Sequence, residues 1–254
     1  NNYFLDATQP YLGFGKLASY CYNGHARAVF KQTVPLYFMP DALLETKVNN
    51  IILYNDSITA GKWNGNISSN LGYNESSYIR NKIVSKGKGV FEKELKSTFT
   101  NNYFIQNIDL EDVDSCEKSM KIKYNVTIGD KQEGNVIYFN PMIIESYKEN
   151  PFKSAIRKYP VEMPYKIDET TTLYIEIPNG YEVDEIPKSA KATLNEADGY
   201  FEYLISKDTD HINFRTRIKL EKAFFMPNEY ENLRTFFNYI VKKQSEQIVF
   251  KKKK

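Results

Sequence analysis

The chain has 254 residues, a length that allows one large domain or two smaller ones, each with its own core. Hydrophobic residues (41%) and charged residues (26%) are at ordinary globular levels, which excludes a disordered chain and a fibrous repeat. The formal net charge of +2, spread along the chain, excludes a nucleic-acid partner held by bulk electrostatics, and no apolar stretch approaches the length of a membrane span.

The first 47 residues are predicted to form an irregular lead-in. A short strand is expected at residues 3–5, and the segment after it is rich in proline and glycine. Proline restricts the backbone angle φ and glycine relaxes it. A segment rich in both is typical of an extended, irregular loop on the protein surface. They are Pro10, Gly13, Gly15, Gly24, Pro35 and Pro40.

Residues 48–148 are predicted to form a β-rich unit with one helix. Apolar residues recur at three- and four-residue steps over residues 75–99, which indicates an amphipathic helix. Gly87 and Gly89 each weaken helix propensity by roughly 1 kcal/mol, so a kink is expected there. Alternating apolar residues predict strands at 48–54, 57–65, 66–73, 103–110, 120–128 and 135–144.

Residues 149–254 are predicted to form a β-sandwich-like domain with one helix, at residues 229–243. Its strands are expected at 171–177, 191–194, 200–205, 212–220 and 247–250. The predicted class is therefore mainly β with two helices (α+β), arranged as two β-sandwich-like units that each pack one helix.

No metal or cofactor site is predicted. Cys21 and Cys116 lack the spacing of a zinc site, and a disulfide between them is left open. An acidic cluster could bind calcium through carboxylate oxygens, but it lacks the glycine and distal glutamate of the helix-loop-helix site, so a solvated hairpin tip is favoured. The cluster consists of Asp109, Glu111, Asp112 and Asp114.

His211 and a set of four aromatic residues are not assigned a functional role. His211 has no second ligand or catalytic partner nearby in sequence and is assigned no chemistry. Four aromatic residues could stack on sugars, but core packing is favoured in a chain with 15% aromatic residues. They are Trp63, Tyr73, Tyr78 and Tyr138.

Several segments resemble one family. The sequence YFLDATQPY at residues 3–11 resembles the end of the catalytic core in bacterial transglutaminase-like proteins of the papain-like superfamily. The rest resembles the C-terminal extension that these proteins carry in gut Bacteroidetes. That resemblance rests on NPF at residues 150–152, RKYPV at 157–161, IPNGY at 177–181 and YENLRTF at 230–236.

The resemblance implies a role for Asp6 as the acid of a Cys-His-Asp triad. In that family the acid orients a histidine for a cysteine nucleophile, and both lie upstream of it. Cys21 and His25 lie downstream of Asp6 and are given no catalytic role. The resemblance also implies export to a periplasm or cell surface.

Two functions are expected from these observations. In the first, the chain is a non-catalytic accessory region that supports an upstream catalytic core of the same polypeptide, or presents substrate to it. In the second, it is an independent module that binds a glycan, peptide or protein at a bacterial surface. A self-contained hydrolase is disfavoured because the sequence shows no nucleophile and base within reach of each other.

Overall fold

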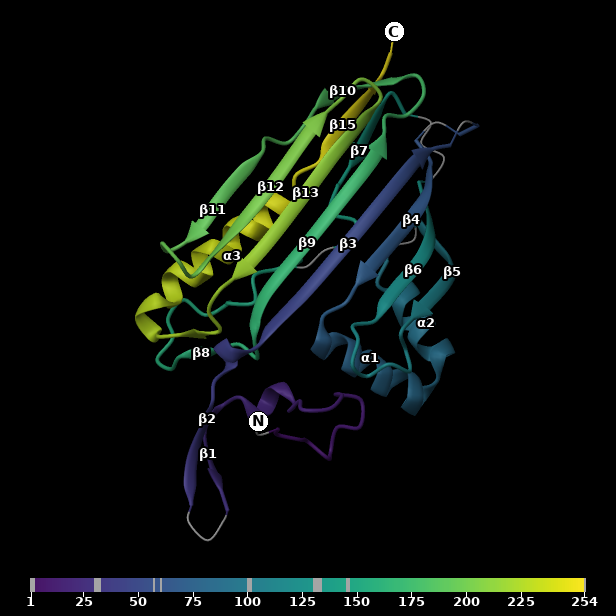
Figure 1. Cartoon of the computed structure of the whole chain (residues 1–254). Coiled ribbons are helices and arrows are strands. Elements are labelled where there is room, and N and C mark those ends of the chain that lie inside the picture. The colour runs from purple at the N-terminus through teal and green to yellow at the C-terminus, as the bar shows by residue number, and fades with distance from the viewer. Residues whose placement is uncertain are drawn as a thin grey trace.

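In the computed structural model, one eight-stranded sheet runs through the whole molecule (Figure 1). The structure describes residues 3–29, 33–56, 58–59, 61–99, 102–129, 134–144 and 147–253. The strand order is β11 (Ala190–Leu194), β12 (Gly199–Lys207), β13 (His211–Leu220), β9 (Lys166–Glu176), β3 (Leu44–Asn55), β4 (Trp63–Asn70), β6 (Lys121–Ile128) and β5 (Tyr103–Glu111).

A parallel pairing between β3 and β9 joins the two halves of the chain. It runs from Leu44 opposite Lys166 to Leu53 opposite Ile175, whereas every other neighbouring pair in the sheet is antiparallel. The α+β class is confirmed, but the halves expected as separate sandwiches share one sheet. Strand alternation in a sequence indicates which face is buried, and it does not indicate which distant strand lies alongside.

A second layer covers one face of this sheet. It contains the helices α1 (Tyr73–Lys86), α2 (Lys88–Ser97) and α3 (Tyr230–Gln244), and a small sheet of β10 (Tyr181–Glu185), β15 (Ile248–Lys252) and β7 (Val136–Phe139). Figure 1 shows α3 behind β11, β12 and β13, and the α1–α2 pair beside β5 and β6. Burying alternate residues of the long strands against this layer creates a single core, which includes Ile51, Trp63 and Phe214.

The opposite face of the sheet carries polar and charged side chains. On it Arg217 forms a bidentate pair with Asp168, with both N···O distances at 2.7 Å. His211 lies on the same face and stacks on Tyr174 with ring centroids 4.7 Å apart. This face is the solvated side of the two-layer structure.

The helix expected over residues 75–99 is two helices. The break falls at Gly87, whose φ of +90° is in the left-handed region that a side chain disfavours. The chain then folds back, and Lys82 of α1 pairs with Glu94 of α2 at 2.6 Å. The kink expected near Gly87 is therefore a complete helix break.

Some expected strands differ from those observed. The short strand expected at residues 3–5 is not formed. Residues 3–6 lack regular secondary structure, because no neighbouring strand pairs with them. The strands expected at 57–65 and 66–73 are the single strand β4, which begins after a turn at Gly61 (φ +77°); residues 57 and 60 lie outside the described part of the chain.

Elements that the sequence did not predict are mostly short. The lead-in contains an antiparallel hairpin of β1 (Gly24–Ala28) and β2 (Val34–Phe38), and β8 (Val161–Glu162) pairs with β14 (Phe224–Phe225). Single 3₁₀ turns lie at Ser19–Cys21, Pro40–Ala42 and Pro227–Glu229. These elements lack the long apolar periodicity that reveals strands and helices in a sequence.

Glu45 ties α1 to the central strand β3. Its buried carboxylate accepts hydrogen bonds from the backbone N–H groups of Asn74 (3.0 Å) and Glu75 (2.9 Å) in the first turn of α1. A negative charge at this position also complements the positive end of the helix dipole. Only glycine fits at position 72, because a Cβ atom there would lie 2.1 Å from Oε1 of Glu45.

We expect Glu45→Ala to lower the free energy of unfolding by about 2 kcal/mol, because it leaves N–H donors of α1 unpaired beside the sheet. Urea denaturation measures the change. Glu45→Gln, which keeps an acceptor oxygen, should lose less, and Glu92→Ala on the outside of α2 should lose under ~0.5 kcal/mol. A Glu45→Ala protein as stable as the Glu92→Ala control would show that this cap does not hold the helix.

Candidate functional site

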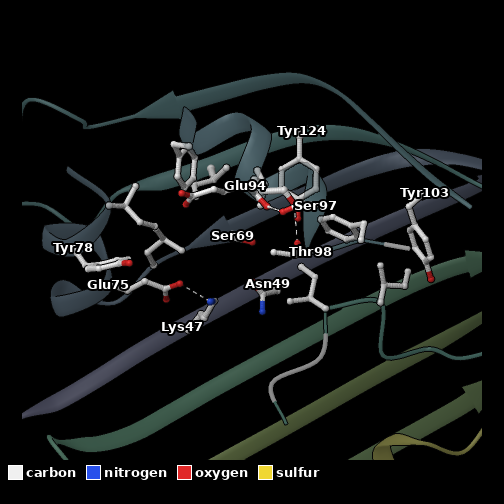
Figure 2. A pocket seen from close by; sticks show the side chains of 18 of the residues that line it. Lys47, Asn49, Ser69, Glu75, Tyr78, Glu94, Ser97, Thr98, Tyr103 and Tyr124 are labelled. Atoms are coloured by element: carbon white, nitrogen blue, oxygen red, sulfur yellow. Dashed lines mark hydrogen bonds and ion pairs between the residues drawn. The ribbon is translucent and has the colours of Figure 1, made fainter. Parts of the chain in front are cut away.

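A cavity of about 730 Å³ lies between the α1–α2 pair and the covered face of the sheet. Its lining comes from α1, α2, strands β3 to β6, residues 140–144 and Lys148. In Figure 2, Tyr78 and the Lys47–Glu75 pair lie at one end of the cavity, Tyr103 lies at the other, and Asn49 and Ser69 lie between them. The arrangement is a pocket built on regular elements.

The wall of the cavity is largely apolar. Aromatic side chains come from α2, from the turn after it and from the facing strands, and aliphatic side chains complete the wall. The principal contributors are Ile79, Phe91, Leu95, Phe99, Ile122 and Tyr124. Burial raises the pKa of the Tyr124 hydroxyl above its ordinary value, because the charged form loses hydration.

The floor of the cavity is polar. Asn49 on β3 lies opposite Ser69 on β4 and, on its other side, opposite Thr171 on β9. Asn49 is 2% exposed, and its Nδ2 donates a hydrogen bond to Oγ1 of Thr171 at 3.1 Å. Its Oδ1 has no hydrogen-bond partner within the described residues. This oxygen is enclosed by protein atoms and does not face the open space of the cavity.

Charged groups at the edge of the cavity are engaged with one another. Lys47 pairs with Glu75 at 2.8 Å, and Lys82 pairs with Glu94 at 2.6 Å. The hydrogen bond between Lys82 and Glu94 raises the pKa of the lysine and lowers that of the glutamate. Lys148 also lines the cavity and has an interaction of its own. The edge therefore offers little uncompensated charge.

Asp6, the residue predicted from the family resemblance, lies in the lead-in and not at the cavity. One carboxylate oxygen accepts hydrogen bonds from the backbone N–H (3.0 Å) and hydroxyl (2.5 Å) of Thr8, and the other accepts one from the Tyr20 hydroxyl (3.1 Å). The hydroxyl of Thr8 is the main cause of a lowered pKa for Asp6. Within the described chain no hydrogen bond or ion pair joins Asp6 to a histidine. Its triad role stays a prediction.

The two cysteines are free thiols. Burial is the main cause of a raised pKa for the Cys21 thiol, and the charge of Asp6 raises it further. A reactive cysteine needs the opposite environment, one that favours the thiolate. The Cys21 thiol therefore lacks the surroundings of a nucleophile. Cys116 lies against the carbonyl oxygen of Pro10, 3.9 Å away.

Asp109 and Glu111 of the acidic cluster lie on β5, and Asp112 and Asp114 belong to the following loop, which wraps around the buried guanidinium group of Arg80. Arg80 of α1, 1% exposed, donates hydrogen bonds to the carbonyl oxygens of Asp112 (2.9 Å), Val113 (2.9 Å), Ser115 (2.8 Å) and Lys118 (2.5 Å). Glu111 and Asp112 pair with Lys123 and Lys118. Over the residues that the structure describes, no three potential metal-ligating side chains gather.

The four aromatic residues considered for sugar binding do not form one platform. Trp63 is buried in the core against Phe139 and Phe250, and its Nε1 donates to the carbonyl oxygen of Glu176 at 2.8 Å. Tyr78 lines the cavity, and Tyr138 is exposed on β7. Sequence reasoning missed the cavity because its lining comes from residues spread over positions 47–148. One available signal was Asn49, a polar residue at an inward-facing position of an apolar strand.

Comparison with known proteins finds a family model that is similar to part of the chain. Residues 135–250 match DUF3858, a domain of unknown function with a solved structure. This stretch covers β7 to β13, α3 and most of β15, and it leaves out β3 to β6, α1 and α2, which build most of the cavity. No curated protein matches the chain.

One solved structure shows a weak likeness. It is described as a "putative protease" from Parabacteroides distasonis, with 19% identity over 39% of this chain and a TM-score of 0.34. The match spans only 19% of that protein, and a likeness at this level supports no conclusion on fold or function.

Among the described residues, no helix has the length and apolar character to cross a membrane.

We expect Thr8→Val to raise the pKa of Asp6 toward its ordinary value, because it removes the hydroxyl donor and keeps the backbone N–H. An NMR titration of the Asp6 carboxyl carbon measures the shift. Tyr20→Phe should produce a smaller rise, since its hydrogen bond contributes less to the shift. A larger effect from Tyr20→Phe than from Thr8→Val would contradict this description of the Asp6 environment.

Proposed function

We propose that the chain is a non-catalytic accessory region of a larger exported protein of the transglutaminase-like or protease-like class. In this role it supports a catalytic core that precedes Asn1 in the same polypeptide, or presents substrate to that core. The observation that carries the proposal is the exposed apolar surface of the part of the lead-in that precedes β3, described at residues 3–29 and 33–43.

Large apolar side chains in the lead-in lie in solvent. Val29 is 89% exposed, Tyr37 72% and Phe14 63%. Among the residues of this segment that the structure describes, only Leu12, Ala18 and Pro40 are buried. Other exposed side chains in the lead-in are Tyr3, Leu5 and Tyr20. A concentration of exposed apolar groups in one segment is typical of a surface that contacts another protein or domain.

The β1–β2 hairpin also favours a covering partner. It extends away from the sheet (Figure 1), and neither of its strands contains a buried residue. A two-stranded hairpin is at best marginally stable in water when no surface packs on it. A core resting on this hairpin would bury Tyr37 and stabilise the pairing.

The chemistry of the lead-in supports a non-catalytic role for this chain alone. Asp6 is satisfied by Thr8 and Tyr20, and the Cys21 thiol is held in its neutral form. Acyl transfer by a thiol needs a nucleophile and a base in hydrogen-bond reach. In the larger protein, Asp6 would be the acid that orients a histidine supplied by the core.

The proposal predicts that a core covers the lead-in. Amide hydrogen exchange is compared between the chain alone and a longer polypeptide that includes the region before Asn1. We expect exchange in β1 and β2 to slow at least ~tenfold in the longer polypeptide, because only protected, hydrogen-bonded amides exchange slowly. Amides of β13, already inside the sheet, serve as the internal control and should not change.

Equal exchange of β1 and β2 in both proteins would contradict the accessory role. So would thiol-dependent amidase activity of the chain alone that is lost in Cys21→Ala. Deletion of residues 50–254 from the longer polypeptide gives a third check. Unchanged stability and activity of the remaining core would show that this region does not support it.

A second function is favoured by a different observation. The cavity is lined by residues of this chain and combines a largely apolar wall with polar residues at its floor. This supports a module that binds its own ligand, alone or beside a core. The accessory and binding functions are compatible, because the lead-in and the cavity are different surfaces.

A further inference from the structure

We propose that the solvated face of the eight-stranded sheet binds a neutral glycan chain, in a groove lined by tyrosine rings and amide side chains. The groove crosses β13, β9, β3, β4 and β6, on the face of the sheet that no described element covers in Figure 1. It is a different surface from the cavity and the lead-in. The proposal rests on the second function, the binding module, and does not depend on the accessory role.

The strand register gathers uncharged side chains into one row across the sheet. Asn213 of β13 lies opposite Tyr174 of β9, which lies opposite Ile52 of β3. Ile52 lies opposite Asn66 of β4, which lies opposite Asn125 of β6. All five side chains point to the solvated face, because the buried positions of each strand alternate with them.

Two hollows lie along this row. The larger, of about 800 Å³, has Tyr174 in its wall with Asn213 beside it. The smaller, of about 380 Å³, has Tyr54 in its wall with Asn66 beside it. The ring centroids of Tyr54 and Tyr174 are 6.4 Å apart, so the two hollows are neighbours and together form the groove.

The two tyrosine rings are accessible and held in place. Tyr54 is 48% exposed. Tyr174 is stacked against His211, with 4.7 Å between the ring centroids, and His211 in turn forms a hydrogen bond of 2.7 Å with Asp210. A ring that is already fixed loses little freedom when a ligand binds. The flat apolar surface of such a ring can pack against the C–H groups of a sugar.

The amide side chains suit hydroxyl groups. Asn66, Asn125 and Asn213 are exposed, and no hydrogen bond within the described chain occupies their amide groups. An asparagine side chain both donates and accepts hydrogen bonds, as a hydroxyl group does. A glycan carries such hydroxyl groups along its whole length, so it can use several amides of the row at once.

An extended peptide fits this face less well. Peptides that bind sheets pair their backbone with an open strand edge. Here β3 lies between β9 and β4, and β4 lies between β3 and β6, so the backbone groups of these strands are already paired. The face offers side chains alone, which favours a ligand recognised through hydroxyl groups and ring faces.

The charges of the groove favour a neutral ligand. Arg215, the one charged residue in the described lining of the larger hollow, pairs with Glu202 at 3.1 Å. Asp56, its counterpart in the smaller hollow, accepts a hydrogen bond from the backbone N–H of Ile58 (2.9 Å) and pairs with Lys62 at 3.5 Å. A charged glycan would lose hydration without gaining an unpaired opposite charge.

The test is an amide NMR titration of the 254-residue chain with four neutral hexasaccharides: cellohexaose, mannohexaose, maltohexaose and chitohexaose. We expect saturable binding of at least one of them, with shifts clustered in β13, β9, β3 and β4. Hexagalacturonic acid, a charged glycan of the same length, should bind at least ~tenfold more weakly, because its charges find no partner. The neutral peptide acetyl-(Ser-Thr)₃-amide, which also carries hydroxyl groups, should not bind.

Matched variants locate the site. Tyr54→Ala and Tyr174→Ala should each weaken binding about tenfold, because each removes a ring from the groove. Asn66→Ala should weaken it about threefold through loss of hydrogen bonds. Tyr174→Phe keeps the ring and should bind like the wild type. So should Tyr138→Ala, which truncates a tyrosine that is 63% exposed on β7 in the other layer.

Several results would overturn the proposal: no binding of any neutral hexasaccharide, full binding to Tyr54→Ala or Tyr174→Ala, equal binding of hexagalacturonic acid, or tighter binding of the peptide. So would a dimer that Tyr174→Ala dissociates, because a second copy would then occupy the groove. Circular dichroism checks that each variant folds. If a variant does not fold, the shifts of the wild type decide the location.

The outcomes separate this site from the proposed functions. Shifts clustered in α1 and α2 would place the ligand in the cavity, which keeps the binding module and overturns the groove. A failed titration has no bearing on amide exchange in β1 and β2, so the accessory role is tested separately.

Discussion

The parallel pairing of β3 with β9 is the constraint on which the rest of the structure depends. These two central strands come from different halves of the chain, and their ten-residue register aligns the inward-facing positions of both. The shared face then receives α1 and α2 beside β5 and β6, and α3 beside β11. The small sheet packs on the same face, where Phe139 of β7 and Phe250 of β15 contact Trp63 of β4. The same register places Thr171 beside Asn49, so the polar floor of the cavity also exists because of this pairing.

Local patterns in the sequence were sufficient for most elements and insufficient for their assembly. Strand alternation located β12 and β13, helical periodicity located α3, and Gly87 marked the position where the helix over residues 75–99 ends. The sheet order depends on contacts more than a hundred residues apart, which no local period encodes. Glu45 and Arg80 illustrate the same limit, because each is buried by a partner segment that is distant in sequence.

The two candidate sites, Asp6 and the cavity, differ in how well the sequence predicts them. Asp6 belongs to a short recognisable motif, and its environment of Thr8 and Tyr20 is local. Its catalytic meaning depends on groups outside this chain and so stays a proposal. The cavity has no motif, since Asn49, Ser69 and Tyr124 become neighbours only when β3, β4 and β6 pair. The match to DUF3858 begins after most of the residues that build the cavity, so most of this site lies outside the matched region.

The central claim is that both halves form one continuous sheet, and coincidence of unfolding transitions tests it most directly. Trp63, the single tryptophan, reports on β4 in the first half by fluorescence, and amide NMR signals of β13 report on the second half. A shared sheet predicts that both probes give the same urea midpoint and slope. Two separate midpoints, with β13 intact after β4 has unfolded or the reverse, would contradict the β3–β9 pairing as the link that holds the molecule together.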